Sequence, residues 1–300
     1  MTFSAKVKTE LCALPIGKGC CALAEAAGAL LYANRFAVDE IRFITEFAVF
    51  AKRLELLFSK AFGLGFDEKK QSEKSGKFSL KIKSPQSIEK IATALGYDRQ
   101  THFAHYINFG LLEETCCMDA FLRGAFLSGG SVTDPEKNYH LELVTHHLSV
   151  ARGILSLLHE RDIFPKETTR RGNFVVYLKQ SEGIEDFLTT IGATGGALEH
   201  MTTKVEKHMK SAIHRKVNCD LANGARSVNA ALDQLAAIRK IEQRAGLESL
   251  PEKLYETALL RIVNPEANLA ELAQLASPSV TKSCMGHRLK KIMELSKEGG

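Results

Sequence analysis

The sequence predicts an α+β chain in which a tandem, pseudo-twofold domain precedes a small all-α domain. Two observations predict this fold class. Segments of the first copy recur in the same order about 96 positions later, which indicates a duplicated unit. After residue 200 the apolar residues follow the helical spacing of i, i+3 and i+4. We therefore expect a duplicated domain over 1–200, a linker over 201–224 and a helical domain over 225–300.

The two copies, about 20–112 and 116–200, share individual residues as well as patterns. Cys20-Cys21 recurs as Cys116-Cys117 at the offset of 96. At the same offset "KFSLKIKSPQSIEKIATALG" recurs as "NFVVYLKQSEGIEDFLTTIG". One such match can arise by chance, but an ordered series indicates a duplication.

Each copy predicts the same order of elements. A helix rich in small apolar residues comes first, "CCALAEAAGALLYA" or "CCMDAFLRGAFLSG". A strand with period-two alternation follows, "EIRFITEF" or "YHLELVTH", and then a helix over about 48–62 or 147–161. Two short strands and a closing helix complete the copy, and Gly96 or Gly192 follows as a C-terminal cap. The small residues of the first helices predict that these two helices meet closely on the pseudo-twofold axis.

Two polar segments are expected at the surface of the duplicated domain. Residues 65–77, "GFDEKKQSEKSGK", are typical of a polar loop. "TTRRGN" predicts a hairpin turn at Arg170 and Arg171, from which these side chains could contact phosphate.

The last third predicts only helices. Residues 201–224 are polar and mixed, and we expect a helical linker with a break around 218–224. "ARSVNAALDQLAAIRKIEQRAG" predicts an amphipathic helix over 225–246. "LPEKLYETALLRIVNP" predicts the next helix, which Pro251 starts and Asn264-Pro265 stops.

Residues 268–297 predict a short helix, a tight turn at "SPS" and a longer basic helix, which is the plan of a helix-turn-helix. Asn268 can cap the short helix, which runs through Ala276. The second helix begins near Val280–Thr281, and its apolar residues can form one inward stripe. Its Lys and Arg side chains would contact phosphates, and Ser283, His287 or Arg288 could reach base edges. The candidate DNA-binding residues are Thr281, Lys282, Ser283, Gly286, His287, Arg288, Lys290 and Lys291. An ordinary helical hairpin with a solvated basic face is the alternative.

The positive charge is concentrated in the same region. The last hundred residues hold 16 Lys and Arg against 11 Asp and Glu, whereas residues 1–200 hold 24 of each. A basic module attached to a neutral one favours nucleic acid as a partner, although a solvated face without a partner has the same composition.

Other features exclude several classes of protein. No apolar run approaches the length of about 20 residues that spans a bilayer, and the N-terminal segment lacks a signal-peptide pattern. We therefore expect a cytoplasmic protein without a membrane partner, and the odd number of seven cysteines indicates free thiols.

No cofactor or metal is expected. His102 and His105 have H-x-x-H spacing and His146-His147 are adjacent, but a zinc site would need further ligands. Cys116-Cys117 could supply them, yet partly buried cysteines at a helix start explain this pair as well. The adjacent histidines are expected where a strand meets a helix, which they could cap.

"FLRGAFLSGGSV", residues 121–132, resembles the signature of LAGLIDADG homing endonucleases. In that pattern the catalytic, metal-binding aspartate falls on Gly129, and the earlier aspartate of the motif falls on Leu127. In the first copy the catalytic position falls on Ala33. Neither alanine nor glycine offers a side-chain oxygen to hold Mg²⁺. The resemblance therefore implies the scaffold of that family without its catalysis.

"VTKSCMGHRLKKI" resembles the helix-turn-helix of WhiA-type regulators, whose typical form is I-S-K-S-G-V-N-H-R-L-R-K-I. "NPEANLAELAQL" and "NCDLAN" fit the same family, as does the order of the domains. Two residues depart from the pattern: Cys284 replaces the usual Gly, and Gly286 replaces the usual Asn. The resemblance implies a bacterial, nucleoid-associated transcriptional regulator that binds double-stranded DNA. It also implies a link to sporulation control in some lineages, or to cell division and chromosome segregation in others.

Two rival functions stay open at this point. A residual endonuclease would use displaced acids such as Asp134 or Glu136 with magnesium. A nucleoid or division scaffold would act mainly through protein partners, such as another transcription factor or a division protein bound by the LAGLIDADG-like domain. The zero net charge of 1–200 argues mildly against strong nonspecific DNA binding by that domain.

Overall fold

The computed structural model describes residues 1–72, 76–97 and 105–297. The chain divides into two compact units, Met1–His208 and Met209–Gly300. The boundary between them falls inside the helix α8 (Thr194–Ala245), within the segment that the sequence predicts as a linker.

The first unit contains two antiparallel sheets with the same strand order, β1-β2-β4-β3 and β5-β6-β8-β7. The first sheet consists of β1 (Arg35–Phe36), β2 (Ile41–Thr45), β3 (Glu68–Gln71) and β4 (Phe78–Ile82). The second consists of β5 (Gly130–Val132), β6 (Leu141–Thr145), β7 (Lys166–Arg170) and β8 (Asn173–Leu178). Thr45 pairs with Phe78 as Thr145 pairs with Phe174, so the register is also the same. The repeated topology confirms the predicted duplication.

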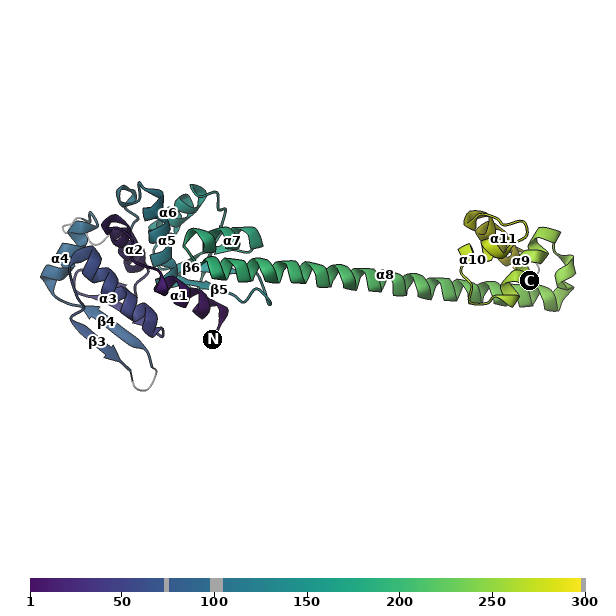
Figure 1. Cartoon of the computed structure of the whole chain (residues 1–300), viewed down its shortest axis with the longest axis horizontal. Helices are drawn as coiled ribbons and strands as arrows, with labels where there is room; N and C mark the ends of the chain where they lie inside the picture. The colour runs from purple at the N-terminus through teal and green to yellow at the C-terminus, as the bar shows by residue number, and fades with distance from the viewer. Residues whose placement is uncertain (73–75, 98–104, 298–300) are drawn as a thin grey trace. The chain divides into compact units, whose positions relative to one another are not determined.

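The helices of the two copies also correspond (Figure 1). They are α2 (Gly19–Leu31), α3 (Ala48–Phe62) and α4 (Pro85–Ala94), followed by α5 (Thr115–Gly129), α6 (Leu148–His159) and α7 (Ser181–Thr190). The closing helices end as predicted, since Gly96 and Gly192 have φ of +73° and +93°. A further helix, α1 (Phe3–Ala13), precedes the first copy, and the sequence analysis did not predict it.

The helices α2 and α5 meet at backbone distance, as their small residues predict. A Cβ atom on Gly28 would lie 2.1 Å from the carbonyl oxygen of Phe121. A Cβ atom on Gly124 would lie 2.0 Å from the carbonyl oxygen of Glu25. Only glycine permits this approach at either position.

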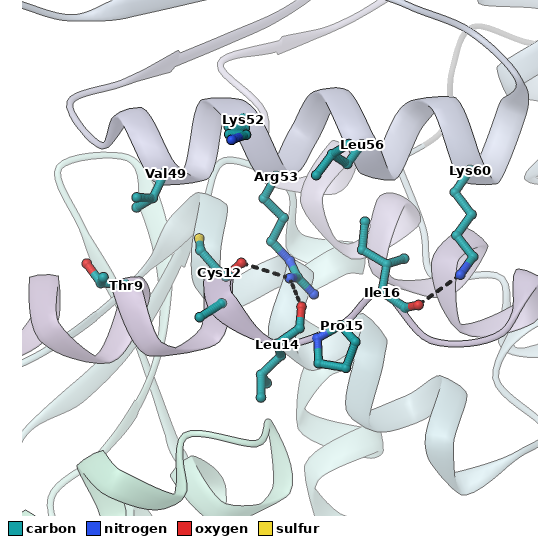
Figure 2. Close-up of a pocket in the computed structure, with 11 residues that line it drawn as sticks. Thr9, Cys12, Leu14, Pro15, Ile16, Val49, Lys52, Arg53, Leu56 and Lys60 are labelled. Atoms are coloured by element: carbon teal, nitrogen blue, oxygen red, sulfur yellow. Dashed lines mark hydrogen bonds between the residues drawn. The ribbon is translucent and has the colours of Figure 1, made fainter.

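The buried carboxylate of Glu25 on α2 links this helix to α3 and α5. It accepts hydrogen bonds from Arg53 on α3 at 2.6 and 2.9 Å, and Arg123 on α5 contacts it at 3.4 Å. Figure 2 shows that Arg53 also donates to the carbonyl oxygens of Cys12 and Leu14, at 3.2 and 2.6 Å. Arg53 therefore fixes the end of α1 against α3 beside a pocket of about 600 Å³.

The expectation of a polar loop over 65–77 is wrong in part. Glu68–Gln71 forms the edge strand β3, which pairs with β4 from Glu68↔Lys81 to Gln71↔Phe78. Its side chains are mostly exposed, so the strand has no buried face that would require alternating apolar residues. The hairpin turn expected at Arg170 and Arg171 is confirmed, because β7 ends at Arg170 and Arg171 has φ of +52°.

The expected break around 218–224 is also wrong, because α8 is continuous from Thr194 to Ala245. The segment contains no proline, and its Lys, Ala, Leu and Arg residues favour a helix. The single glycine at 224 costs only about 1 kcal/mol relative to alanine.

The second unit is all-α. It contains the last part of α8, then α9 (Glu252–Val263), α10 (Leu269–Leu275) and α11 (Lys282–Leu295). Gly246, with φ of +74°, follows the end of α8 as predicted, and the helix expected after Pro251 is confirmed. The buried core is formed by Ile238, Ile241, Leu247, Leu250, Ala258, Leu272, Ala273, Ala276, Met285, Leu289 and Ile292. Among the described residues no helix combines the length and apolar character needed to cross a membrane.

Candidate nucleic-acid interface

The short helix α10 begins at a complete capping box. The Asn268 side chain accepts hydrogen bonds from the backbone N–H groups of Ala270 and Glu271, at 2.9 and 3.2 Å. The Glu271 carboxylate accepts the N–H of Asn268 in return, at 2.8 Å. This arrangement satisfies the free donors of the helix start and confirms the predicted cap.

The longer helix α11 is capped by Thr281, whose hydroxyl accepts the N–H of Cys284 at 3.2 Å. Met285, Leu289 and Ile292 are fully buried against α9 and α10. Val280 and Leu295 are half-buried against the same core. The predicted inward stripe is therefore confirmed, and it fixes which face of α11 lies in solvent.

The solvent face of α11 carries the candidate DNA-binding residues. Exposed members are Thr281, Lys282, Ser283, His287, Lys290 and Lys291, and the half-buried members are Gly286 and Arg288. We refer to these eight residues as the α11 face. Glu294 contacts Lys291 at 3.5 Å and partly neutralises the C-terminal end of the face. Lys282 lies instead at the helix N-terminus, where the helix dipole adds positive potential.

Gly286 leaves space on the α11 face. A Cβ atom there would lie 3.9 Å from Leu269 Cδ1, which is ordinary van der Waals contact. Packing within this unit therefore does not require glycine at 286.

Gly129, on which the catalytic aspartate falls in the LAGLIDADG resemblance, packs against an aromatic ring. A Cβ atom on Gly129 would lie 2.2 Å from Cδ1 and 2.9 Å from Cγ of Tyr32. Tyr32 is buried at the end of α2, and its hydroxyl has no hydrogen-bond partner in the part of the chain that the structure describes. The corresponding residue of the first copy, Ala33, packs half-buried against the core.

A lysine stands at the end of α5 near the same place. Lys8 Nζ donates to the carbonyl oxygen of Leu127 at 3.1 Å. It also lies 5.6 and 5.7 Å from the ring centroids of Phe47 and Phe126. Burial lowers the pKa of Lys8 to about 8.

The acids near this position in sequence are engaged elsewhere. Asp119 pairs with Arg161 at 2.8 Å. Asp134 accepts the N–H of Glu136 at 2.9 Å, in the loop that follows β5. Both aspartates therefore have partners within the second copy.

The comparisons with known proteins agree along the whole chain. Residues 118–210 match the family described as the WhiA LAGLIDADG-like domain, and residues 213–296 match the WhiA C-terminal HTH domain. A "Probable cell division protein WhiA" of Ruminiclostridium cellulolyticum is 37% identical over 99% of this chain and 97% of its own. A relative of the same description from Heliobacterium modesticaldum is 35% identical over 100% and 98%.

The chain belongs to the WhiA family. A solved structure of full-length DUF199/WhiA from "Thermatoga maritima" superposes with a TM-score of 0.62 and 27% identity, covering 100% of this chain and 99% of that one. The resemblances to the LAGLIDADG and WhiA families, and the fold class predicted from them, are thereby confirmed.

The histidines behave differently from the prediction. His147 precedes α6, but its side chain makes no capping bond; the Thr145 hydroxyl accepts the His147 N–H at 3.2 Å instead. The His147 ring stacks on that of His105, with centroids 3.8 Å apart. His102 lies outside the described residues.

The structure brings together two cysteine pairs that the duplication relates but that were not predicted to form one cluster. Cys20 and Cys21 begin α2, Cys116 and Cys117 begin α5, and these two helices pack on one another. Their shared offset within the duplication was the feature that could have revealed the cluster.

Proposed function

We propose that this chain is a non-enzymatic transcriptional regulator that contacts double-stranded DNA through the α11 face. The observation that supports it is the burial of Met285, Leu289 and Ile292, which turns the basic side of α11 to solvent. The major groove of B-DNA admits an α-helix, so an exposed, capped, basic helix of this kind can enter it.

The proposed roles follow from side-chain chemistry. Lys282, Arg288, Lys290 and Lys291 neutralise phosphates, because lysine and arginine supply most backbone contacts. Ser283 and His287 reach base edges, while Thr281 caps the helix start that approaches the DNA. Gly286 supplies no amide, so the base contact that asparagine makes with adenine is absent at this position.

The biological setting is proposed from the relatives. Their printed name is probable cell division protein, and we extend a role in cell division to this chain. Sporulation control and chromosome segregation, and a cytoplasmic, nucleoid-associated location, belong to the same proposal.

We further propose that the LAGLIDADG-like unit has lost nuclease activity. The Tyr32 ring against Gly129 supports this, because it occupies the space that an acidic side chain would need. The unit then serves as a second DNA surface or as a platform for another transcription factor or division protein.

The test of the α11 face is DNA binding by the full-length chain across a salt series, followed by fluorescence anisotropy. Lys282→Ala with Lys290→Ala should weaken binding and lower the slope of log K against log salt by about 2, since each lost phosphate contact removes roughly 0.9. The matched control is Lys240→Ala with Lys253→Ala, two exposed lysines on α8 and α9. Equal slopes for the two double variants would exclude the α11 face as the phosphate-binding surface.

The role of the first unit is tested with fragments 1–208 and 209–300, each of which contains its own core. If only 209–300 binds DNA with a steep salt slope, the first unit is a partner platform. If 1–208 binds as tightly, the duplicated domain holds DNA and contributes to sequence specificity.

A further inference from the structure

Four thiols converge where the first turns of α2 and α5 meet. The Sγ atoms of Cys21 and Cys116 are 3.4 Å apart, and those of Cys20 and Cys21 are 4.0 Å apart. The Sγ atoms of Cys20, Cys21 and Cys117 all lie within 4.8 Å of one another. Cys116 is not part of that mutually close group and joins it through its contact with Cys21. Each helix therefore contributes an adjacent pair of cysteines to the cluster, with Cys116 at its edge.

In both helices the two cysteines are the second and third residues, so each pair lies in the first turn of its helix. The thiolate is the form of cysteine that binds metal.

The spacing fits a tetrahedral metal better than a disulfide. Zinc–sulfur bonds of about 2.3 Å at tetrahedral angles place neighbouring sulfurs about 3.8 Å apart, close to the separations of 3.4 and 4.0 Å in the cluster. A single disulfide would use two of the four sulfurs, and all seven cysteines of the chain are free thiols. A set of four sulfur ligands selects a soft or borderline metal over Mg²⁺ or Ca²⁺.

The cluster is also accessible to a metal. Cys117 is buried with 2% of its surface exposed, Cys21 is half-buried, and Cys20 and Cys116 are exposed. Gly17 packs directly against Cys21, since a Cβ atom on it would lie 3.0 Å from Cys21 Cβ. The site is thus closed on the protein side and open to solvent on the other.

We propose that Cys20, Cys21, Cys116 and Cys117 bind one structural zinc ion that joins the two copies at the start of their central helices. Cys20, Cys21 and Cys117 supply three sulfurs to one ion, and Cys116, at the edge of the cluster, supplies the fourth, which leaves no open position for catalysis. The ion holds the N-terminal ends of α2 and α5 together, whereas Gly28 and Gly124 hold their middles. The proposal is independent of DNA binding, because the cluster lies in Met1–His208 and the α11 face lies in the other unit.

The test is the zinc content of the full-length chain, purified under reducing conditions without chelator and measured by mass spectrometry of the metal. The wild type should hold about one zinc per chain, and cobalt substitution should give the thiolate-to-cobalt charge-transfer absorption of a tetrahedral sulfur site. Cys21→Ser with Cys116→Ser should reduce zinc content at least about tenfold. The control, Cys219→Ser with Cys284→Ser, removes two cysteines outside the cluster and should keep the zinc.

A second variant guards against loss of the fold. Cys20 is exposed, so Cys20→Ser leaves the core intact and should still lower zinc affinity at least about tenfold while circular dichroism is unchanged. Folded wild type that takes up no zinc and exposes all its thiols to a thiol reagent would overturn the proposal. A Cys21–Cys116 disulfide in the freshly purified, metal-free chain would overturn it equally, as would zinc retained in the Cys21→Ser, Cys116→Ser variant.

Discussion

Tyr32 and Gly129 form one packing unit although they belong to different copies. The ring of Tyr32, at the end of α2, lies where a side chain on Gly129, at the end of α5, would project. An acidic side chain at 129 would therefore require the Tyr32 ring to move. Lys8 adds a positive charge at the same end of α5, where it binds the carbonyl oxygen of Leu127.

Restoring the acid should not restore cleavage. Gly129→Asp brings a Cβ atom against the Tyr32 ring, and we expect destabilisation of about 1–3 kcal/mol from overpacking. Magnesium-dependent nicking of plasmid DNA should stay absent. Ser131→Asp is the control, because it adds the same charge at an exposed residue of β5. Metal-dependent nicking by the Gly129→Asp protein would contradict this prediction.

Lys8 should make stability depend on pH above neutrality. Its pKa of about 8 in the folded chain lies below the ordinary lysine pKa of 10.5, so the unfolded chain binds more protons between these values. The free energy of unfolding should therefore rise as the pH increases from about 8 to 10.5, by up to roughly 3 kcal/mol.

Lys8→Met should remove this rise, as urea unfolding at several pH values will measure. The difference between variant and wild type should be largest below pH 8, where Lys8 is charged. Lys6→Met serves as the control, because Lys6 is largely exposed and pairs with Glu199 at the surface. A wild-type free energy of unfolding that does not change between pH 8 and 10.5 would rule out a destabilising buried charge on Lys8.

At the scale of elements, patterns local in sequence predict local structure well. The apolar helices, the alternating strands β2 and β6, and the caps at Asn268 and Gly246 all follow from neighbouring residues. The edge strand β3 is the first of the two short strands expected in the copy, but its bounds do not follow from the sequence. Its mostly exposed Glu-Lys-Lys-Gln side chains carry no pattern, and only the backbone pairing with β4 defines it.

The candidate sites divide in the same way. The α11 face could be predicted, since one amphipathic helix contains both its buried stripe and its exposed residues. The cysteine cluster could not be read from either copy alone, because each helix supplies half of it. The Tyr32–Gly129 contact likewise joins residues 97 positions apart, and no local signal describes it.

The central helix pair gives a test at this scale. Gly124→Ala places a Cβ atom 2.0 Å from the carbonyl oxygen of Glu25, so α2 and α5 must move apart. We expect a loss of at least about 1–3 kcal/mol in the free energy of unfolding. Gly224→Ala is the matched control, since it lies in the helix α8 with nothing within 4 Å of the new Cβ. That change should be neutral or stabilising by about 0.5–1 kcal/mol, and equal losses for both would contradict close packing at 124.

At the scale of the whole molecule, the two units share the helix α8, whose residues 211–230 are exposed throughout. The helix carries a row of exposed apolar side chains both inside and outside this segment. These are Leu198, Met201, Val205, Met209, Ile213, Val217, Leu221, Val228 and Leu232. A helix without packing is marginally stable in water, so this stretch is the part of α8 that opens most easily.

Limited trypsin digestion should therefore cut first between Lys210 and Arg226, where Arg215 and Lys216 also offer sites. Two resistant fragments should accumulate, one from each unit, and mass spectrometry of the products will locate the cuts. The buried parts of α8 near Ala197 and Ile238 act as internal controls, because they should be cut later. First cleavage inside either core would show that the segment is protected by packing.

The contact between Tyr32 and Gly129 also bears on how such a chain can evolve. An acid gained first at 129 collides with the ring, and a small residue gained first at 32 leaves a cavity beside a glycine, which costs stability as well. Each single step toward an acid at 129 therefore passes through a less stable intermediate, and two changes in different copies must coincide. Selection for a well-folded scaffold is then enough to keep an acid from arising at this position.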